Sequence, residues 1–158
     1  EDIDAISVCE EGVGPKRVKT AASIRLVPVH DELKKMGFID FVKKQKAAGE
    51  VYLFPEIKPG AYNYRSHNFT RWFGRFIRDI EAYTPETTFH SFRHNFRDAL
   101  RNAEVPSEIA NSLGGWSNGD EVSGNYGKGY FSEVLNKHLQ RIEYKGLDLS
   151  HLYIRRGD

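Results

Sequence analysis

The sequence predicts an α+β fold that is mainly helical, with a small antiparallel β-sheet or hairpin near the N-terminus. Apolar and polar residues alternate in IDAISVCE (3–10) and SIRLVPVH (23–30), as they do in half-buried strands. After residue 30 the apolar residues instead recur three or four apart, which is typical of helices. With 158 residues, the chain is long enough for one domain with its own core.

A turn rich in glycine and proline at residues 12–15 joins the two expected strands and predicts a hairpin. A first helix is expected from Asp31, which caps its start, to Gly49, which ends it. Gly37 can break this helix in two. The residues expected on its buried face are Leu33, Met36, Ile39, Phe41 and Val42.

Four more helices are expected, over residues 66–83, 89–103, 106–113 and 131–142, followed by a terminal strand or tail at 147–154. In three of them the apolar spacing predicts the side that faces the core. These residues are Phe69, Trp72, Phe73, Phe76, Ile77 and Ile80 in the first of these helices, Phe89, Phe92, Phe96 and Leu100 in the second, and Phe131, Val134, Leu135, Leu139 and Ile142 in the last.

Composition limits the possible classes of protein. No segment approaches the roughly 18 apolar residues that span a membrane, and the acidic N-terminus does not resemble a signal peptide. Cys9 is the only cysteine, which excludes an internal disulfide and a cysteine-based zinc site. We therefore expect a cytoplasmic protein.

The formal net charge of +1 argues weakly against a nucleic-acid partner, but the bases are clustered. Four of them lie between Lys16 and Arg25 without an acid, and four more lie between Arg65 and Arg78. Such clusters can form one cationic face, and the local face matters more for DNA than the total charge.

The segment TFHSFRHNFRDALR (88–101) places a polar stripe beside an apolar one. His90 and Arg93 are three residues apart and share a helix face, and His94 lies one turn above His90. One interpretation is a solvated polar face. The other is a phosphate held by His90 and Arg93 while a nucleophile attacks it.

Three further residues each have an ordinary interpretation when taken alone. Trp116, after two glycines in a glycine-rich loop, can be a buried plug, and Tyr126 can be a surface aromatic. Lys19, beside the expected hairpin, can be any hairpin lysine.

Together these motifs resemble the C-terminal catalytic domain of the tyrosine recombinase, or phage integrase, family, over nearly the whole chain. RVKTAASIRLVPVHDEL resembles the hairpin that carries the catalytic lysine, here Lys19. TFHSFRHNFRDALRNAEVP resembles the His-x-x-Arg helix, with His90 and Arg93, and LGGWS resembles the following His-or-Trp position, Trp116. YGKGY then supplies the nucleophile, Tyr126.

The resemblance implies site-specific DNA recombination or integration, of the phage or mobile-element type, through a 3′-phosphotyrosine intermediate. His90 would accept or relay the phenol proton of Tyr126, and Arg93 would hold the phosphate oxygens. Lys19 would protonate the leaving 5′ oxygen, and Trp116 would donate its indole N–H and exclude water. No cofactor or metal is implied. The partners are double-stranded DNA and further protomers, as a tetramer on DNA. The expected DNA contacts are Lys16, Arg17, Arg65 and Arg71.

The chain departs from the family pattern in two ways. The family has another catalytic arginine on a helix before the first strand, whereas this sequence starts at EDIDAI, already in the expected strand region. We therefore expect residues 1–158 to be a single partial domain without full activity. The gap between Trp116 and Tyr126 is one residue longer than usual, which leaves Tyr130 as a less favoured nucleophile.

Two alternatives stay open. A catalytically inactive DNA-binding or protein-interaction module would have the same fold. A helical domain without a DNA partner would show no salt-dependent DNA binding. The tail at 147–154 can either exchange between protomers or fold back on its own chain.

Overall fold

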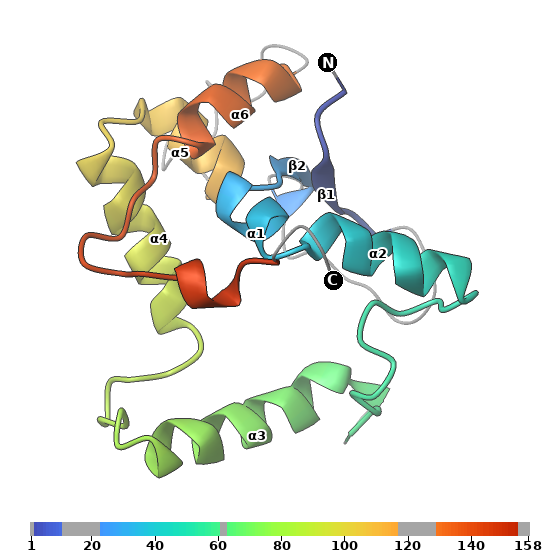
Figure 1. The fold of residues 1–158 in the computed structure, drawn as a ribbon. Helices are drawn as coiled ribbons and strands as arrows, with labels where there is room; N and C mark the ends of the chain where they lie inside the picture. Colours follow the sequence, from blue (N-terminus) through green and yellow to red (C-terminus); the bar gives the residue numbers. More distant parts are fainter. Residues whose placement is uncertain (1, 11–22, 61–62, 117–128, 155–158) are drawn as a thin grey trace. The chain divides into compact units, whose positions relative to one another are not determined.

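The computed structural model describes residues 2–10, 23–60, 63–116 and 129–154 (Figure 1). Its fold is mixed α and β, with about half of these residues helical and a small two-stranded antiparallel sheet. This confirms the predicted class at that level. Within the four described ranges, no helix combines the length and the apolar character needed to cross a membrane.

The chain divides into two compact units. Unit 1 comprises Glu1–Phe41 and Arg97–Asp158, and unit 2 comprises Val42–Phe96. The boundaries fall inside two helices, α2 (Phe38–Ala47) and α4 (Ser91–Asn102). Each unit is described by itself below.

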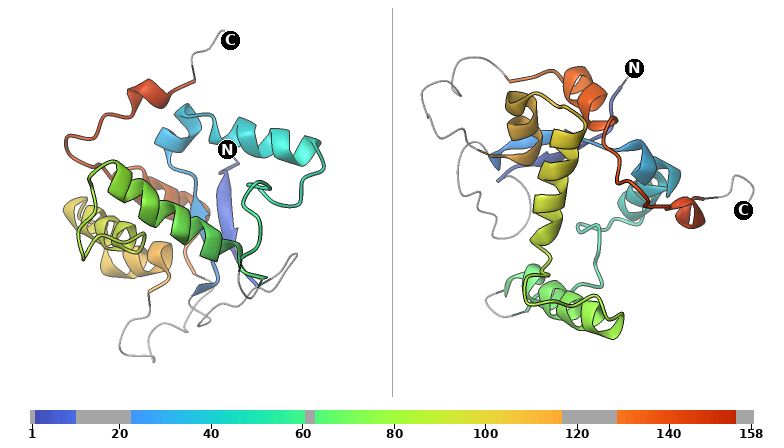
Figure 2. Two further views of the ribbon diagram at one scale, coloured as in Figure 1. Left: turned by 90° about the horizontal axis from the view of Figure 1, so that it is seen from below. Right: turned by 90° about the vertical axis from the view of Figure 1, so that its left-hand side faces the viewer.

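The sheet of unit 1 consists of β1 (Ala5–Val8) and β2 (Arg25–Pro28), which run side by side in opposite directions (Figure 2). In the register of the pair, Ala5 lies opposite Pro28, and Val8 lies opposite Arg25. Both predicted strands are therefore confirmed, although each is shorter than its alternating pattern.

Two helices pack on this sheet. Both α5 (Ser107–Gly114) and α6 (Ser132–Leu139) contact β2 and each other (Figure 1). They enclose the core of unit 1 together with the second half of α4. The buried apolar side chains are Val29, Ala99, Leu100, Val105, Ile109, Leu113, Leu135, Leu139 and Ile142.

The prediction for the last helix is confirmed at Leu135, Leu139 and Ile142 but wrong at Phe131, whose side chain is 80% exposed. Phe131 is the N-cap residue, with φ −62° and ψ 149°, so its backbone is extended. A residue outside the helix does not follow the helical spacing, and its side chain points away from the buried face.

The predicted first helix is broken at Gly37 into α1 (Asp31–Lys35) and α2. Gly37 adopts φ 79°, in the left-handed region that favours glycine. The N-cap of α1 is His30 rather than the expected Asp31, and its Nδ1 accepts a hydrogen bond of 3.2 Å from the Glu32 amide. Of the five residues predicted to face the core, four are half-buried and none is fully buried, and Leu33 is 38% exposed. The predicted side is therefore confirmed only in part.

The C-terminal segment folds back onto α1. It contains a short 3-10 helix, η3 (Ser150–Leu152), in place of the strand that was one alternative. The amide of Ile154 donates a 3.0 Å hydrogen bond to the Lys35 carbonyl, and the Tyr153 hydroxyl donates one to the Glu32 carboxylate. The Ile154 side chain also fills the space that a Cβ on Gly37 would need. Glycine at position 37 thus permits both the break and the return of the tail.

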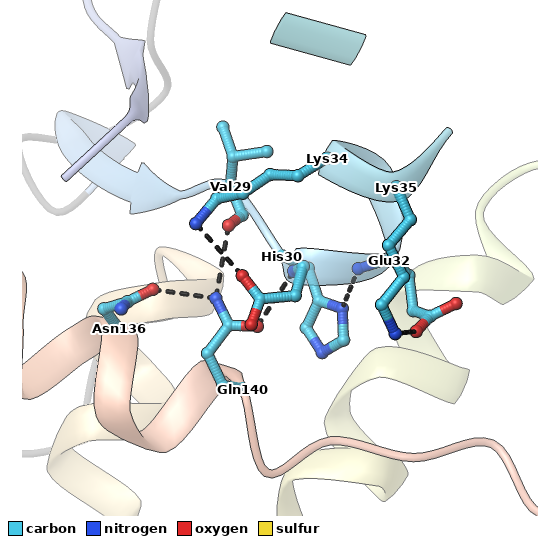
Figure 3. A network of polar contacts seen from close by, with 8 residues as sticks. Val29, His30, Glu32, Lys34, Lys35, Asn136 and Gln140 are labelled. Carbon is cyan, nitrogen blue, oxygen red and sulfur yellow. Dashed lines mark hydrogen bonds and ion pairs between the residues drawn. The ribbon is translucent and has the colours of Figure 1, made fainter. Parts of the chain in front are cut away.

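A single amide joins α6 to the junction between β2 and α1 (Figure 3). The Nε2 of Gln140 donates to the Val29 carbonyl at 3.2 Å and to Asn136 Oδ1 at 2.8 Å. Its Oε1 accepts from the Asp31 amide at 2.9 Å. Because both ends of the amide are used, its orientation is fixed and it holds the helix against the chain that leaves the sheet.

Unit 2 is built around α3 (Arg65–Asp79), which ends before the predicted Tyr83 because Glu81 adopts a left-handed φ of 57°. Among its described residues only Ile77 is a buried apolar side chain. Aromatic rings of α3 instead contact each other and the residues at the start of α4. The ring contacts join Phe69, Trp72, Phe73, Phe76, Phe89 and Phe92.

Several aromatic residues that were predicted to lie in the core are therefore half exposed. Trp72 is 50% exposed, Phe89 is 50% and Phe92 is 56%, whereas Leu100, further along α4, is fully buried in unit 1. Phe89 meets the rings of Phe69 and Phe92 edge to face, whereas the ring of Trp72 lies nearly parallel to that of Phe76.

Candidate functional site

His90 and Arg93 lie at the start of α4, in unit 2. The helix begins at Ser91, so the prediction that His90 lies inside it is wrong. Here the Thr88 amide donates to Ser91 Oγ at 3.0 Å, and this side-chain contact holds residues 88–91 in a turn.

The turn still keeps the predicted pair together. The Arg93 amide donates a 2.9 Å hydrogen bond to the His90 carbonyl, which leaves both side chains within one turn of chain. The ring of His90 meets that of His94 edge to face, with 5.2 Å between centroids, as the predicted spacing implies. His90 is exposed and Arg93 is half-buried. The backbone therefore places His90 and Arg93 within one turn of each other, and the ring of His90 contacts that of His94.

Trp116 lies in unit 1, directly after the end of α5. The preceding Gly115 is the C-cap, with φ 61°, and the Trp116 amide donates to the Asn111 carbonyl at 3.0 Å. The indole lies over Gly114, where a Cβ would collide with the ring. The two glycines thus have separate roles, since one turns the chain and the other makes room for the indole.

The first residue of β2 reaches the same place. Arg25 Nε donates a 3.1 Å hydrogen bond to the Leu113 carbonyl, and its Nη1 donates to the Ser23 carbonyl at 2.8 Å. The guanidinium also occupies the space beside Gly115 in which a side chain would otherwise lie. The end of the hairpin and the residues that hold Trp116 are therefore in direct contact.

Arg97 is a second arginine at this place. Its guanidinium lies 5.1 Å from the centre of the Trp116 ring, within the range of a cation–π contact. The sequence places Arg25 in a basic cluster, but its pattern indicated no role for Arg25 or for Arg97. The two glycines before Trp116 were the available signal, because such a pair indicates a close approach by another part of the chain.

Tyr130, the less favoured nucleophile, is tied to α5. Its hydroxyl donates a 2.7 Å hydrogen bond to Glu108 Oε2. This bond to a carboxylate, together with partial burial, raises the pKa of the Tyr130 phenol. A phenol with a raised pKa is harder to ionise, so the geometry disfavours Tyr130 as an attacking group.

The two arginines expected to bind DNA differ in their surroundings. The Arg65 guanidinium stacks over the Tyr52 ring at 3.6 Å and donates to the Ile57 carbonyl, so it holds the loop before α3. Arg71 is exposed on α3. Both belong to unit 2, and of the pair only Arg71 is exposed, since Arg65 is half-buried.

The remaining predicted site residues, Lys16, Arg17, Lys19 and Tyr126, lie outside the described residues. The described chain thus contains two parts of the predicted site. His90 and Arg93 are together in unit 2, and Trp116 lies beside the end of the hairpin in unit 1.

Comparisons with known proteins add no assignment, since no family model, curated protein or solved structure matches the chain. Within the part of the chain that the structure describes, no three His, Cys, Asp or Glu side chains gather in an arrangement that could hold a metal ion.

Proposed function

We propose that the chain carries the catalytic groups of a tyrosine-type site-specific recombinase, which cuts and rejoins duplex DNA. The observation that carries this proposal is the contact between Arg25 and the Leu113 carbonyl. It joins the strand that follows the Lys19 segment to the turn that holds Trp116. Arg25, six residues after Lys19 in the sequence, therefore lies beside the turn that holds Trp116, and both Lys19 and Trp116 are proposed to act on one phosphate.

The pair on α4 supplies the second support. An arginine fork suits the non-bridging oxygens of a phosphodiester, and a neighbouring histidine suits a proton transfer or a further bond to the phosphate. The hydrogen bond from the Arg93 amide to the His90 carbonyl keeps these residues adjacent before any ligand arrives. Such preorganisation is what electrostatic stabilisation of a transition state requires.

The proposed reaction proceeds in two balanced steps. In the first, the Tyr126 phenol loses its proton to His90, and its oxygen forms a bond to the phosphorus. The bond from phosphorus to the 5′ oxygen breaks, and Lys19 gives that oxygen a proton. A 3′-phosphotyrosine and a free 5′-hydroxyl result. In the second step, the 5′-hydroxyl of a partner strand gives its proton to Lys19, and its oxygen forms a bond to the phosphorus. The bond from phosphorus to the Tyr126 oxygen breaks, and His90 returns a proton to the phenol.

The partners proposed with this function are double-stranded DNA and further copies of the protein, as a tetramer on DNA. Lys16, Arg17, Arg65 and Arg71 are the proposed phosphate contacts. For Arg65 this requires release from the Ile57 carbonyl, so Arg71 is the stronger candidate. We also propose a cytoplasmic location, which the single cysteine supports.

The test is covalent trapping. The protein, expressed from its gene at full length, is incubated with a nicked duplex from which the cleaved end diffuses away. A protein–DNA adduct is expected with the unaltered protein and with Tyr130→Phe, and none is expected with Tyr126→Phe. An adduct that persists in Tyr126→Phe would refute the assignment of the nucleophile.

DNA binding separates the alternatives. If no variant forms an adduct but the protein binds duplex DNA more weakly as salt rises, the inactive DNA-binding module is correct. If binding is absent or independent of salt, the DNA assignment itself is wrong. His90→Gln and Arg93→Lys serve as intermediate variants, since each is expected to slow adduct formation without preventing DNA binding.

A further inference from the structure

We propose that a small hollow on unit 1, where the second half of α4 meets α5, binds one backbone phosphate of duplex DNA. The inference rests on the proposed function, but it concerns a second phosphate, next to the one that is cleaved. Its lining combines the apolar groups of Val105, Ala110 and Trp116 with the two arginines Arg97 and Arg101.

The residues around the hollow favour an anion. Ser107 and Asn111 add a hydroxyl and an amide to the two guanidinium groups, and the described residues that line it include no carboxylate. The hollow measures about 110 Å³. That is well below the ~300–1,000 Å³ of sites for drug-sized molecules, so it fits a single small group such as a phosphate.

Arg97 and Arg101 give the hollow a net positive charge. Arg97 and Arg101 are one helical turn apart, where like charges repel. Arg101 forms a 3.0 Å ion pair with Asp98, but both side chains are about 65% exposed, so that pair is weak. Arg97 has an aromatic neighbour, Trp116, and no carboxylate within ion-pair distance among the described residues. A bound phosphate would relieve the repulsion.

DNA is the source of phosphate that the surroundings favour. In sequence, Arg97 follows the proposed catalytic Arg93 by four residues on the same helix. The hollow also borders Trp116, which is itself proposed to contact the cleaved phosphodiester. A strand with one phosphate at the catalytic groups has further phosphates along its backbone, and one of these would enter the hollow.

The salt dependence of DNA binding tests this site. Each phosphate contact contributes a slope of about −0.9 to a plot of log affinity against log salt. Arg97→Met keeps the apolar stem against Trp116 but removes the charge. We expect the slope to become shallower by about one contact and the affinity at low salt to fall about two- to fivefold. Arg97→Lys is expected to retain the slope.

Two controls make the result specific. Arg141 is an exposed arginine at the end of α6 that does not line the hollow, so Arg141→Met is expected to leave the slope unchanged. Asp98→Asn removes the carboxylate that pairs with Arg101 and is expected to strengthen DNA binding. Thermal unfolding of each variant checks that the fold is intact.

The outcomes distinguish this inference from the function on which it rests. If the unaltered protein binds DNA but Arg97→Met has the same slope, the hollow does not hold a DNA phosphate and the inference alone is overturned. If the unaltered protein shows no salt-dependent binding, both fail.

A second experiment titrates the protein with inorganic phosphate at constant ionic strength. Binding is monitored by the fluorescence of Trp116 in a Trp72→Phe background. A short duplex is expected to change the fluorescence and to compete with phosphate. Saturation by phosphate without competition from the duplex would assign the site to a free anion and overturn the DNA assignment.

Discussion

The guanidinium Nε of Arg25 donates a hydrogen bond to the carbonyl oxygen of Leu113, which ties the first residue of β2 to the last turn of α5. The carbonyls at the end of a helix lack partners within the helix, and a cation there is also favoured by the helix dipole. This bond therefore stabilises α5 and fixes the position of the hairpin at the same time.

Gly115→Ala is expected to destabilise unit 1 through two separate effects. A side chain at φ 61° costs about 1–2 kcal/mol, and the new Cβ would displace the Arg25 guanidinium, at a further cost of about 1 kcal/mol. Urea denaturation measures the total loss in the free energy of unfolding.

The matched control for this change is Gly146→Ala. Gly146 also has a positive φ, of 83°, but no atom lies within 4 Å of its Cβ position. We expect only the first cost there. In an Arg25→Met background the two glycine substitutions are expected to cost the same. Equal costs in the unaltered protein would mean that the Arg25 contact contributes nothing.

Leu100→Ala and Phe131→Ala are expected to differ sharply, although helical spacing predicted both residues to be buried. Leu100 is 0% exposed, so its truncation leaves a cavity and costs about 2–5 kcal/mol in the free energy of unfolding. Phe131 is 80% exposed, and its truncation is expected to change stability by less than about 0.5 kcal/mol. Urea denaturation of the two variants measures both losses in the free energy of unfolding. A large loss for Phe131→Ala would contradict the exposed position of Phe131.

The Tyr130 phenol is expected to titrate above its ordinary value because its hydroxyl donates to Glu108. A raised pKa means that the folded state favours the protonated phenol. This contribution to stability is therefore complete at neutral pH and is lost as the pH rises through the raised pKa.

Glu108→Gln is expected to return the pKa of Tyr130 toward about 10. NMR of ¹³C-labelled tyrosine against pH measures it, and Tyr130→Phe assigns the signal. An unchanged titration in Glu108→Gln would show that the carboxylate is not the cause.

The return of the tail to α1 is expected to depend on pH through Glu32. Hydrogen bonds from Lys35 and Tyr153 lower the pKa of the Glu32 carboxyl below its ordinary value of 4.5. The contact therefore contributes fully above that value and is lost as the pH falls through the lowered pKa. Hydrogen exchange of the Ile154 amide, corrected for its intrinsic rate, is expected to speed up in that acidic range.

Glu32→Gln is expected to abolish this pH dependence. Asp31→Asn is the matched control, because Asp31 pairs with Lys34 at 3.0 Å and not with the tail. An equal effect of both substitutions would indicate a general loss of helix stability in place of a specific contact.

Local patterns predicted the parts of the fold that depend on local structure. The two strands and the break at Gly37 follow from alternation and from the conformational freedom of glycine. The inward residues of α6, Leu135 and Leu139, follow from helical spacing. These signals lie within a few residues of the feature that they predict.

Local sequence patterns did not predict features that depend on contacts with other segments or on the exact geometry of a turn. The bond between Arg25 and Leu113 spans 88 residues, and the glycines after Leu113 indicate a close approach at this turn but not which segment makes it. His90 was predicted to lie in an α-helix, but the turn that contains it is closed by hydrogen bonds between residues three apart, and α4 begins only at Ser91. Helical spacing on α3 predicted that Trp72 faces the core, but spacing within one helix cannot predict whether other apolar residues cover that side.

Because Arg25 bonds to the end of α5, a movement of the strand pair and a movement of the turn before Trp116 are coupled. If a ligand drew the strand pair away, the last turn of α5 would lose the cation that stabilises it. If the turn shifted first, Arg25 would lose its hydrogen bond to Leu113, and β2 would lose a contact at its first residue. A ligand that moves either segment is therefore expected to affect the other.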